Sequence, residues 1–141
     1  MNEDMKYRLE VVMIGVSDVD RAKAFYSERA GFKLEVDSQQ GQKMRVVQLT
    51  PPGSACSIVF GTGMGDMEPG VHKGLQLCVA DVRAAREQLA ARGVDISEVV
   101  VFEAGEQRPA REGDDLDMAG FAFFQDPDGN NWAVQQMPSV N

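Results

Sequence analysis

The sequence has little of what several protein classes require. Its 141 residues include only two cysteines, Cys56 and Cys78, too few for the disulfide framework of a small secreted protein. No apolar run approaches the roughly 20 residues that a membrane-spanning helix needs. The opening segment MNEDMKYRLE is polar and acidic, so we expect no secretory signal there. These absences predict a cytoplasmic protein with no membrane partner.

Positive charge is also scarce. Lys and Arg number 14 against 22 Asp and Glu, which gives a net charge of -8. Such a surface repels a phosphate backbone, so nucleic acid and anionic membranes are excluded as partners. A cationic small molecule would be attracted, although salt screens exposed charge beyond about 10 Å. The apolar fraction of 43% is that of an ordinary globular chain, and the length suits one domain or two halves sharing one core.

A passage from strand to helix occurs twice along the chain. In the first, the apolar run 9–16 predicts a buried strand, Asp18 can cap a helix, and Gly31 can end it. In the second, Asp81 and Gly93 take the same two roles after a strand pattern. A shift of 63 residues superposes Asp18 on Asp81 and aligns the apolar positions before them, which indicates an internal duplication.

Short strand patterns follow each expected helix. After the first helix they cover residues 32–36, 44–49 and 57–60, with a polar turn at 38–41 and a break at 51–53. After the second they cover residues 96–102, 121–125 and 131–136, with a type I turn at 126–129. Residues 103–120 are long, polar and acidic as a segment, so we expect a mobile loop there. One half is too small to bury its own sheet face, so we expect a shared core.

Two motifs carry a resemblance to a known family. The segments SDVDRAKAFY in the first half and FFQDPDGNNWAVQ near the end resemble the vicinal oxygen chelate superfamily, over roughly residues 8–137. That group includes glyoxalase I, extradiol dioxygenases, fosfomycin-resistance transferases and bleomycin-binding proteins. The resemblance implies an α+β fold of two tandem βαββ(β) modules, residues 1–68 and 69–141, whose curled mixed sheets form a cupped cavity.

Metal-dependent members of this superfamily place one ligand on each of four strands, usually His, Gln or Glu. By the resemblance, the four positions fall here on Val11, Ile58, Gly74 and Ala133. None of these side chains can donate a lone pair to a divalent ion, so we predict no metal and no cofactor. A register slip of one residue would bring Glu10 into the first position, but it would also turn Val12 and Ile14 into the cavity.

Strand alternation then predicts the lining of the cavity. If Val11 faces it, Val12 and Ile14 pack under the helix, as do Leu75 and Leu77 in the second half. We predict that the ligand-binding residues are Val11, Met13, Ile58, Phe60, Gln76, Cys78, Ala133 and Gln135. Apolar walls with a few polar groups are typical of a small-molecule site.

Each of these residues also has a structural interpretation. The two glutamines equally fit a solvated rim, and Met13 and Phe60 equally fit core packing. Cys78 could act as a nucleophile only with a base beside it, and the single histidine, His72, lies in the linker.

Three residues near the end of the chain are expected to be structural. Trp132 lies on the strand face opposite Ala133, which predicts packing under a helix. Asp126 and Asp128 fit the turn better than they fit catalysis.

The sequence leaves two alternatives open for the acidic segment 103–117 and two for the function. The segment holds six carboxylates against Arg108 and Arg111, which suits a solvated surface or an acidic lid for a cationic ligand. The leading hypothesis is a homodimeric, metal-independent binding protein that sequesters or carries a hydrophobic compound, in one version a cation. The alternative is an enzyme of the same superfamily, a lyase, isomerase or dioxygenase, that uses non-standard residues or ligands. No catalytic residue is assigned.

Overall fold

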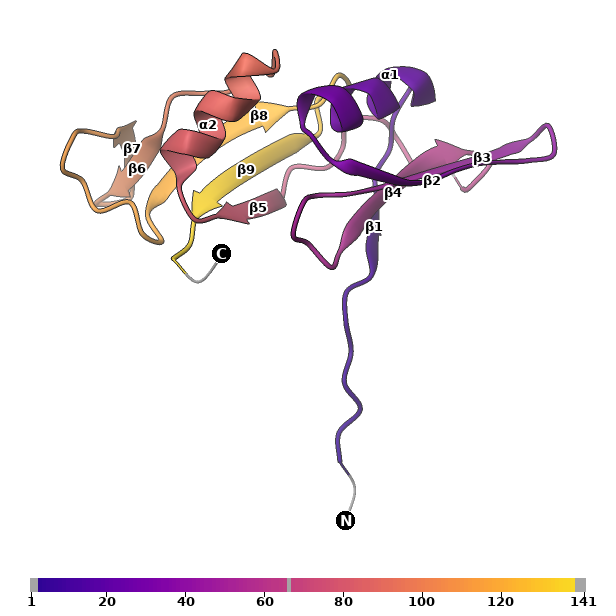
Figure 1. The fold of residues 1–141 in the computed structure, drawn as a ribbon, viewed down its shortest axis with the longest axis horizontal. Helices are drawn as coiled ribbons and strands as arrows, with labels where there is room; N and C mark the ends of the chain where they lie inside the picture. Colours follow the sequence, from indigo (N-terminus) through magenta and orange to yellow (C-terminus); the bar gives the residue numbers. More distant parts are fainter. Residues whose placement is uncertain (1–2, 66, 139–141) are drawn as a thin grey trace.

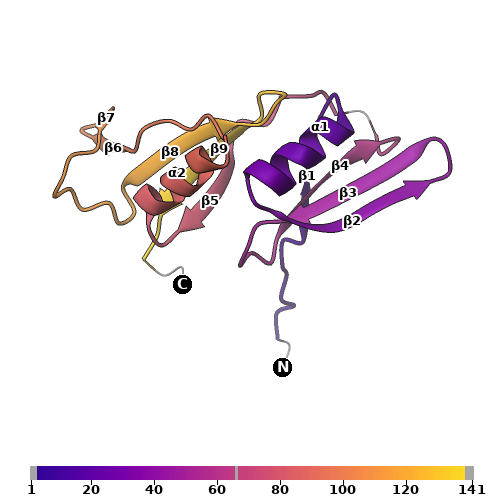
Figure 2. The same cartoon turned by 45° about the horizontal axis from the view of Figure 1, so that its top comes forward.

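The computed structural model describes residues 3–65 and 67–138, which form two mixed sheets with both helices on one side (Figures 1 and 2). The first sheet has the order β1 (Val11–Met13), β4 (Ser57–Thr62), β3 (Met44–Thr50), β2 (Lys33–Gln40). The second has the order β5 (Leu75–Val79), β9 (Asn131–Gln136), β8 (Gly120–Gln125), β6 (Val100–Glu103), β7 (Glu106–Pro109). The helices are α1 (Val19–Ala24), which continues as the π-helical turn η1 (Phe25–Arg29), and α2 (Val82–Ala91). The predicted α+β class is confirmed.

Both helices begin in the same way. The carboxylates of Asp18 and Asp81 each accept a hydrogen bond of 3.0 Å from the backbone three residues ahead, at Arg21 and Ala84. The two capping residues also share one backbone conformation, with φ and ψ of -137° and 107° at Asp18 and -141° and 102° at Asp81. The predicted repeat of the strand-to-helix passage is confirmed. Within the described residues, neither helix is long and apolar enough to cross a membrane.

The predicted boundaries are wrong in four places. The strand expected at residues 96–102 begins only at Val100, as β6. The first strand covers only Val11–Met13, and β2 runs through Ser38–Gln40, where a turn was expected. The segment expected to be one loop contains β7, which pairs with β6 as a hairpin. Arg108 on β7 explains that order, because its guanidinium bonds both Glu103, at 2.7 Å, and Asp114, at 3.0 Å.

Aromatic packing joins the two halves around one buried core. Tyr26, on η1, is fully buried, and its ring centroid lies 5.6–5.9 Å from those of Phe32, Phe60 and Trp132. Trp132 comes from the second sheet, so this cluster spans both halves. The predicted packing of Trp132 against the helix side is confirmed.

A buried polar network holds the turn at residues 126–129 against the first half. The Tyr26 hydroxyl and the Asn130 side-chain amide each donate to Oδ2 of Asp126 at 2.7 Å. Trp132 Nε1 donates to the Tyr26 oxygen at 3.0 Å, and Asn130 also donates to the Gly15 carbonyl at 2.9 Å. Burial, and then the Asp126 carboxylate, raise the pKa of Tyr26 far above its ordinary value, so the hydroxyl stays a donor. The predicted structural role of Asp126 is confirmed.

An ion-pair network between α1, β2 and β3 gives a prediction about pH. Arg45 holds Asp37 with two hydrogen bonds of 3.0 Å, and Lys23 adds one of 2.7 Å. The Arg45 guanidinium, and then Lys23, hold the pKa of Asp37 well below its usual range. The carboxylate therefore contributes stability above the ordinary aspartate pKa of about 4, and loses it as the pH falls toward the lower folded-state pKa.

We expect Arg45→Gln to lower the free energy of unfolding by about 1 kcal/mol at pH 7, and by progressively less below pH 4, in urea titrations. Lys33→Gln is the control, because its ammonium lies 3.9 Å from Glu35 and is largely exposed. An equal loss for Arg45→Gln at pH 7 and pH 2 would contradict this interpretation.

Candidate functional site

The second sheet presents a face that α2 does not cover. Leu75, Leu77 and Val79 pack against the core, so the alternate residues of β5, Gln76 and Cys78, point to the other side. Strand pairing extends this face: Ala133 lies beside Gln76, Gln135 beside Cys78, and Phe123 and Phe121 follow on β8. We call this surface the open face, defined by Gln76, Cys78, Phe121, Phe123, Ala133 and Gln135.

Aromatic rings form one wall of the open face. The rings of Phe121 and Phe123 are parallel within 4°, with centroids 6.1 Å apart. Phe102, on β6, is 49% exposed and meets Phe121 edge to face, with centroids 5.4 Å apart. Three neighbouring phenyl groups, one of them half exposed, give an apolar surface suited to a ring-containing ligand.

The amide groups of the open face are held in fixed orientations. Gln135 donates from Nε2 to the Met118 carbonyl at 2.8 Å, and its Oε1 accepts a short hydrogen bond from Gln76. The Gln76 oxygen has no hydrogen-bond donor in residues 3–65 and 67–138, so it can accept from a ligand.

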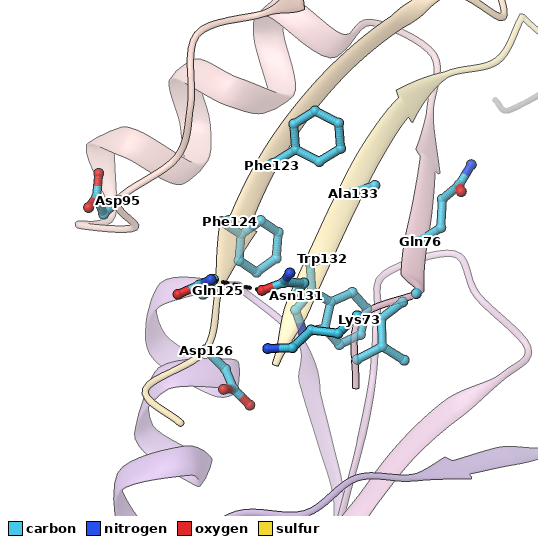
Figure 3. Close-up of a pocket in the computed structure, with 12 residues that line it drawn as sticks. Lys73, Gln76, Asp95, Phe123, Phe124, Gln125, Asp126, Asn131, Trp132 and Ala133 are labelled. Atoms are coloured by element: carbon cyan, nitrogen blue, oxygen red, sulfur yellow. Dashed lines mark hydrogen bonds between the residues drawn. The ribbon is translucent and has the colours of Figure 1, made fainter. Parts of the chain in front are cut away.

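A hollow of about 710 Å³ extends from the open face past the ends of β5, β8 and β9 (Figure 3). Its apolar part includes Phe123 and Ala133. Its polar part includes Lys73, Asp95 and the pair formed by Gln125 and Asn131, whose side chains are joined by a hydrogen bond of 2.8 Å. The volume lies within the usual range for sites that hold drug-sized molecules.

Six of the eight predicted ligand-binding residues lie where the alternation places them. Gln76, Cys78, Ala133 and Gln135 share the open face, as the pairing of β5 with β9 shows. Val11 and Met13 are exposed on the side of the first sheet that α1 does not cover, which we call the open side. Whether these six residues contact a ligand stays a prediction.

The predicted orientation of Ile58 and Phe60 is wrong. The parallel register of β1 and β4 pairs Val12 with Ile58 and Met13 with Val59. Paired residues of neighbouring strands share a side, so Ile58 lies with Val12 toward the helix, where both it and Phe60 are buried in the core. Ser57 and Val59 take the open side instead.

The sequence model of the glyoxalase/bleomycin resistance protein/dioxygenase superfamily matches residues 8–134. The chain belongs to this superfamily. None of the curated proteins matches it.

Solved structures of superfamily members are similar over nearly the whole chain. TnmS3, an antibiotic binding protein from Streptomyces sp. CB03234, is 30% identical, with a TM-score of 0.71, over 96% of this chain and 99% of its own. A glyoxalase/bleomycin resistance protein from the same organism is 32% identical, with a TM-score of 0.66, over 89% and 97%. A superfamily member from Sphaerobacter thermophilus DSM 20745 is 26% identical, with a TM-score of 0.71, over 93% and 98%.

The residues at the four positions where the resemblance implies metal ligands do not fit a metal ion. The side chains of Val11, Gly74 and Ala133 have no atom that could coordinate a metal ion. Ile58 is buried in the core. In the part of the chain that the structure describes, no group of three or more His, Cys, Asp or Glu side chains could hold an ion. No step of chemistry through a metal follows from these residues.

Cys78 lacks the partner that nucleophilic chemistry needs. Its thiol is exposed on the open face, and among the described residues no hydrogen bond joins it to His72. The His72 Nε2 atom instead lies 3.0 Å from the sulfur of Met67. A nucleophilic thiol needs a base within hydrogen-bond reach, so Cys78 is better suited to contact a ligand than to attack one.

Phe121 and Phe123 were missed by the sequence analysis, although a signal was present. In GFAFFQ, Phe121 and Phe123 alternate with Ala122 and Phe124, which are buried in the core. A hairpin turn at 126–129 fixes the pairing of β8 with β9, so Ala133 and Gln135 on one face imply Phe123 and Phe121 beside them. That step needed only the turn already predicted.

Proposed function

We propose that this protein binds a hydrophobic small molecule on the open face, without a metal ion, and sequesters or carries it. The observation that carries the proposal is the composition of this face: a wall of three phenyl rings beside two oriented glutamines. Apolar area supplies the binding free energy, and the fixed amides select the orientation of the ligand.

The class of ligand is proposed from charge and from relatives. TnmS3, which shares 30% of its residues with this chain, is an antibiotic binding protein, so a compound of antibiotic size is a reasonable ligand here. The net charge of -8 favours a cation over an anion of the same shape. The Asp95 carboxylate and the Lys73 ammonium both line the hollow, so the preference for a cation rests on the net charge.

We propose binding without turnover on the basis of the groups that lie on the open face itself. General-base catalysis requires a base within about 3 Å of the proton that it removes, directly or through one water. In the described part of the chain, no carboxylate or imidazole is hydrogen-bonded to Cys78, Gln76 or Gln135. These contacts support the binding function over the enzymatic alternative.

We also propose a homodimer. Val11 and Met13 on β1, Met44 on β3 and Val36 on β2 are all exposed on the open side of the first sheet, spread from one edge of the sheet to the other. Apolar side chains exposed on one side of a sheet are usually covered by a partner or a ligand. A second copy offers such cover, and it would enclose a ligand that lies on the open face.

The test is elemental analysis of protein purified without chelator, followed by a thermal-shift screen of hydrophobic compounds, neutral and cationic. We expect less than about a tenth of an equivalent of any transition metal, since a catalytic site needs about three protein ligands. We also expect a saturable rise in melting temperature with at least one compound. A stoichiometric metal, or a screen without any stabilising compound, would contradict the proposal.

A further inference from the structure

Two residues of the described chain hold a backbone conformation that their side chains disfavour. Glycine occupies every other position with a positive φ, but Ala104 has φ 54° and Met118 has φ 64°. Ala104 has a simple explanation, because it forms with Gly105 the two-residue turn between β6 and β7. A hairpin turn of that length needs a positive φ at both positions. Met118 needs another explanation.

Met118 is the third residue of the turn 116–119. The Ala119 amide closes this turn by donating to the Leu116 carbonyl at 3.0 Å. A positive φ at the third position is typical of a type II turn, which normally has glycine or asparagine there. The glycine nearby serves another purpose: a β-carbon on Gly120 would lie only 2.9 Å from Cβ of Leu116. Met118 therefore keeps a strained backbone that glycine at the same position would relieve.

This turn lies at one end of the open face. The segment between β7 and β8 returns to the end of β9, where the Met118 amide donates to the Gln136 carbonyl at 2.9 Å (Figure 1). The Met118 carbonyl accepts a hydrogen bond of 2.8 Å from Nε2 of Gln135, whose Oε1 orients Gln76. Phe121, on β8, pairs with Gln135. Met118 is thus bonded directly to an amide of the open face and lies next to the aromatic wall.

The Met118 side chain does not stabilise the free protein. It is 56% exposed, whereas Leu116, two residues earlier, is buried in the core and anchors the turn there. A large apolar side chain in water, on a strained backbone, costs free energy without a contact in return. Strained residues of this kind occur mainly where proteins hold ligands, because the ligand contact is what offsets the strain.

We propose that Met118 contacts the ligand and helps to select it, and that its strained conformation is retained for this contact. Its side chain covers the part of a ring-containing compound that lies next to Gln135. The methionine sulfur contacts aromatic rings favourably, and the flexible side chain adapts to rings of different shape. This role rests on the proposed function and adds a residue that no strand of the open face contains.

The first test measures stability and binding in the same variant. Met118→Gly should raise the melting temperature of the free protein by about 2 °C, because glycine adopts a positive φ without strain. It should also raise the dissociation constant of rhodamine 6G, a planar hydrophobic cation, by about three- to tenfold, since an apolar contact is lost. Fluorescence anisotropy measures the binding. A residue with a purely structural role would not combine a gain in stability with a loss of affinity.

Two control variants separate the strain from the contact. Ala104→Gly relieves the other strained position, at the tip of the hairpin formed by β6 and β7, so it should also raise the melting temperature. It should leave the affinity for rhodamine 6G unchanged. Met118→Leu keeps both the strain and the apolar volume, so we expect the wild-type melting temperature and a dissociation constant within about twofold of the wild-type value.

The outcomes distinguish the role of Met118 from the proposed function. A wild-type protein that does not bind rhodamine 6G saturably would overturn both. Saturable binding with the same affinity in Met118→Gly would overturn the role of Met118 alone, as would an equal loss of affinity in Ala104→Gly. A melting temperature of Met118→Gly at or below the wild-type value would overturn the retained strain on which this role depends.

The second test observes the contact itself. Protein with isotopically labelled methionine methyl groups is titrated with rhodamine 6G and followed by nuclear magnetic resonance, and Met118→Leu assigns the Met118 signal by its loss. We expect this signal to shift saturably, with the dissociation constant that anisotropy gives. Met44, at the start of β3 in the first sheet, is the internal control and should not shift. A Met118 signal that stays in place while the dye binds would overturn the proposal.

Discussion

Replacing Asp126 with alanine is expected to lower the free energy of unfolding by about 4 kcal/mol, as measured by urea denaturation. The carboxylate accepts hydrogen bonds from the Tyr26 hydroxyl, the Asn130 side chain and the backbone amides of Asp128 and Asn130. Alanine would leave these donors without their acceptor in a site that is almost wholly buried. It would also release the turn that holds the second half of the chain against the first.

Two further variants separate this network from general damage to the turn. Tyr26→Phe should cost about 2 kcal/mol, because it removes one donor from Asp126 and leaves Trp132 Nε1 without its acceptor. Asp115→Ala, at an exposed carboxylate that accepts one backbone hydrogen bond, should cost less than about 0.5 kcal/mol. A loss below about 1 kcal/mol for Asp126→Ala would show that the network is not needed to join the halves.

Replacing Phe123 with alanine is expected to weaken the binding of a planar hydrophobic cation by tenfold to a hundredfold. Rhodamine 6G is a suitable probe, followed by fluorescence anisotropy. Phe123 lines the hollow and its ring lies parallel to that of Phe121, so its removal takes away one member of the aromatic wall. Losing such a ring from a contact costs roughly 1.4 to 2.7 kcal/mol, which corresponds to that range of affinity.

The controls for this prediction keep the fold and change one property at a time. Phe123→Leu retains apolar volume without a ring, so it should lose less affinity than Phe123→Ala. Fluorescein, an anion with a similar ring system, should bind the wild-type protein more weakly than rhodamine 6G, because the net charge of -8 repels it. Unchanged affinity in Phe123→Ala would exclude the aromatic wall as the binding surface.

The parts of the fold that local chemistry determines could be predicted from the sequence. The caps at Asp18 and Asp81 and the turn at residues 126–129 each depend on a few neighbouring residues, and all three formed as expected. The alternation of β5 is also clear, since Leu75, Leu77 and Val79 leave only Gln76 and Cys78 for the other face. These local patterns were enough to identify four residues of the open face.

The remaining parts depend on contacts between distant segments. Ser57–Phe60 is buried at every position, so its composition does not show which side faces the helix, and the predicted orientation of Ile58 and Phe60 was wrong. The order of β7 depends on Arg108 reaching Glu103 and Asp114, which no strand pattern shows.

The central claim is that a small molecule binds on the open face, and nuclear magnetic resonance of isotopically labelled protein tests it most directly. Rhodamine 6G is titrated into the protein while the backbone amides and the glutamine side-chain amides are followed. The account predicts saturable shifts concentrated at Gln76, Phe121, Phe123, Ala133 and Gln135, with the same shifts after treatment with a chelator. Shifts confined to the first sheet, or shifts that the chelator abolishes, would contradict it.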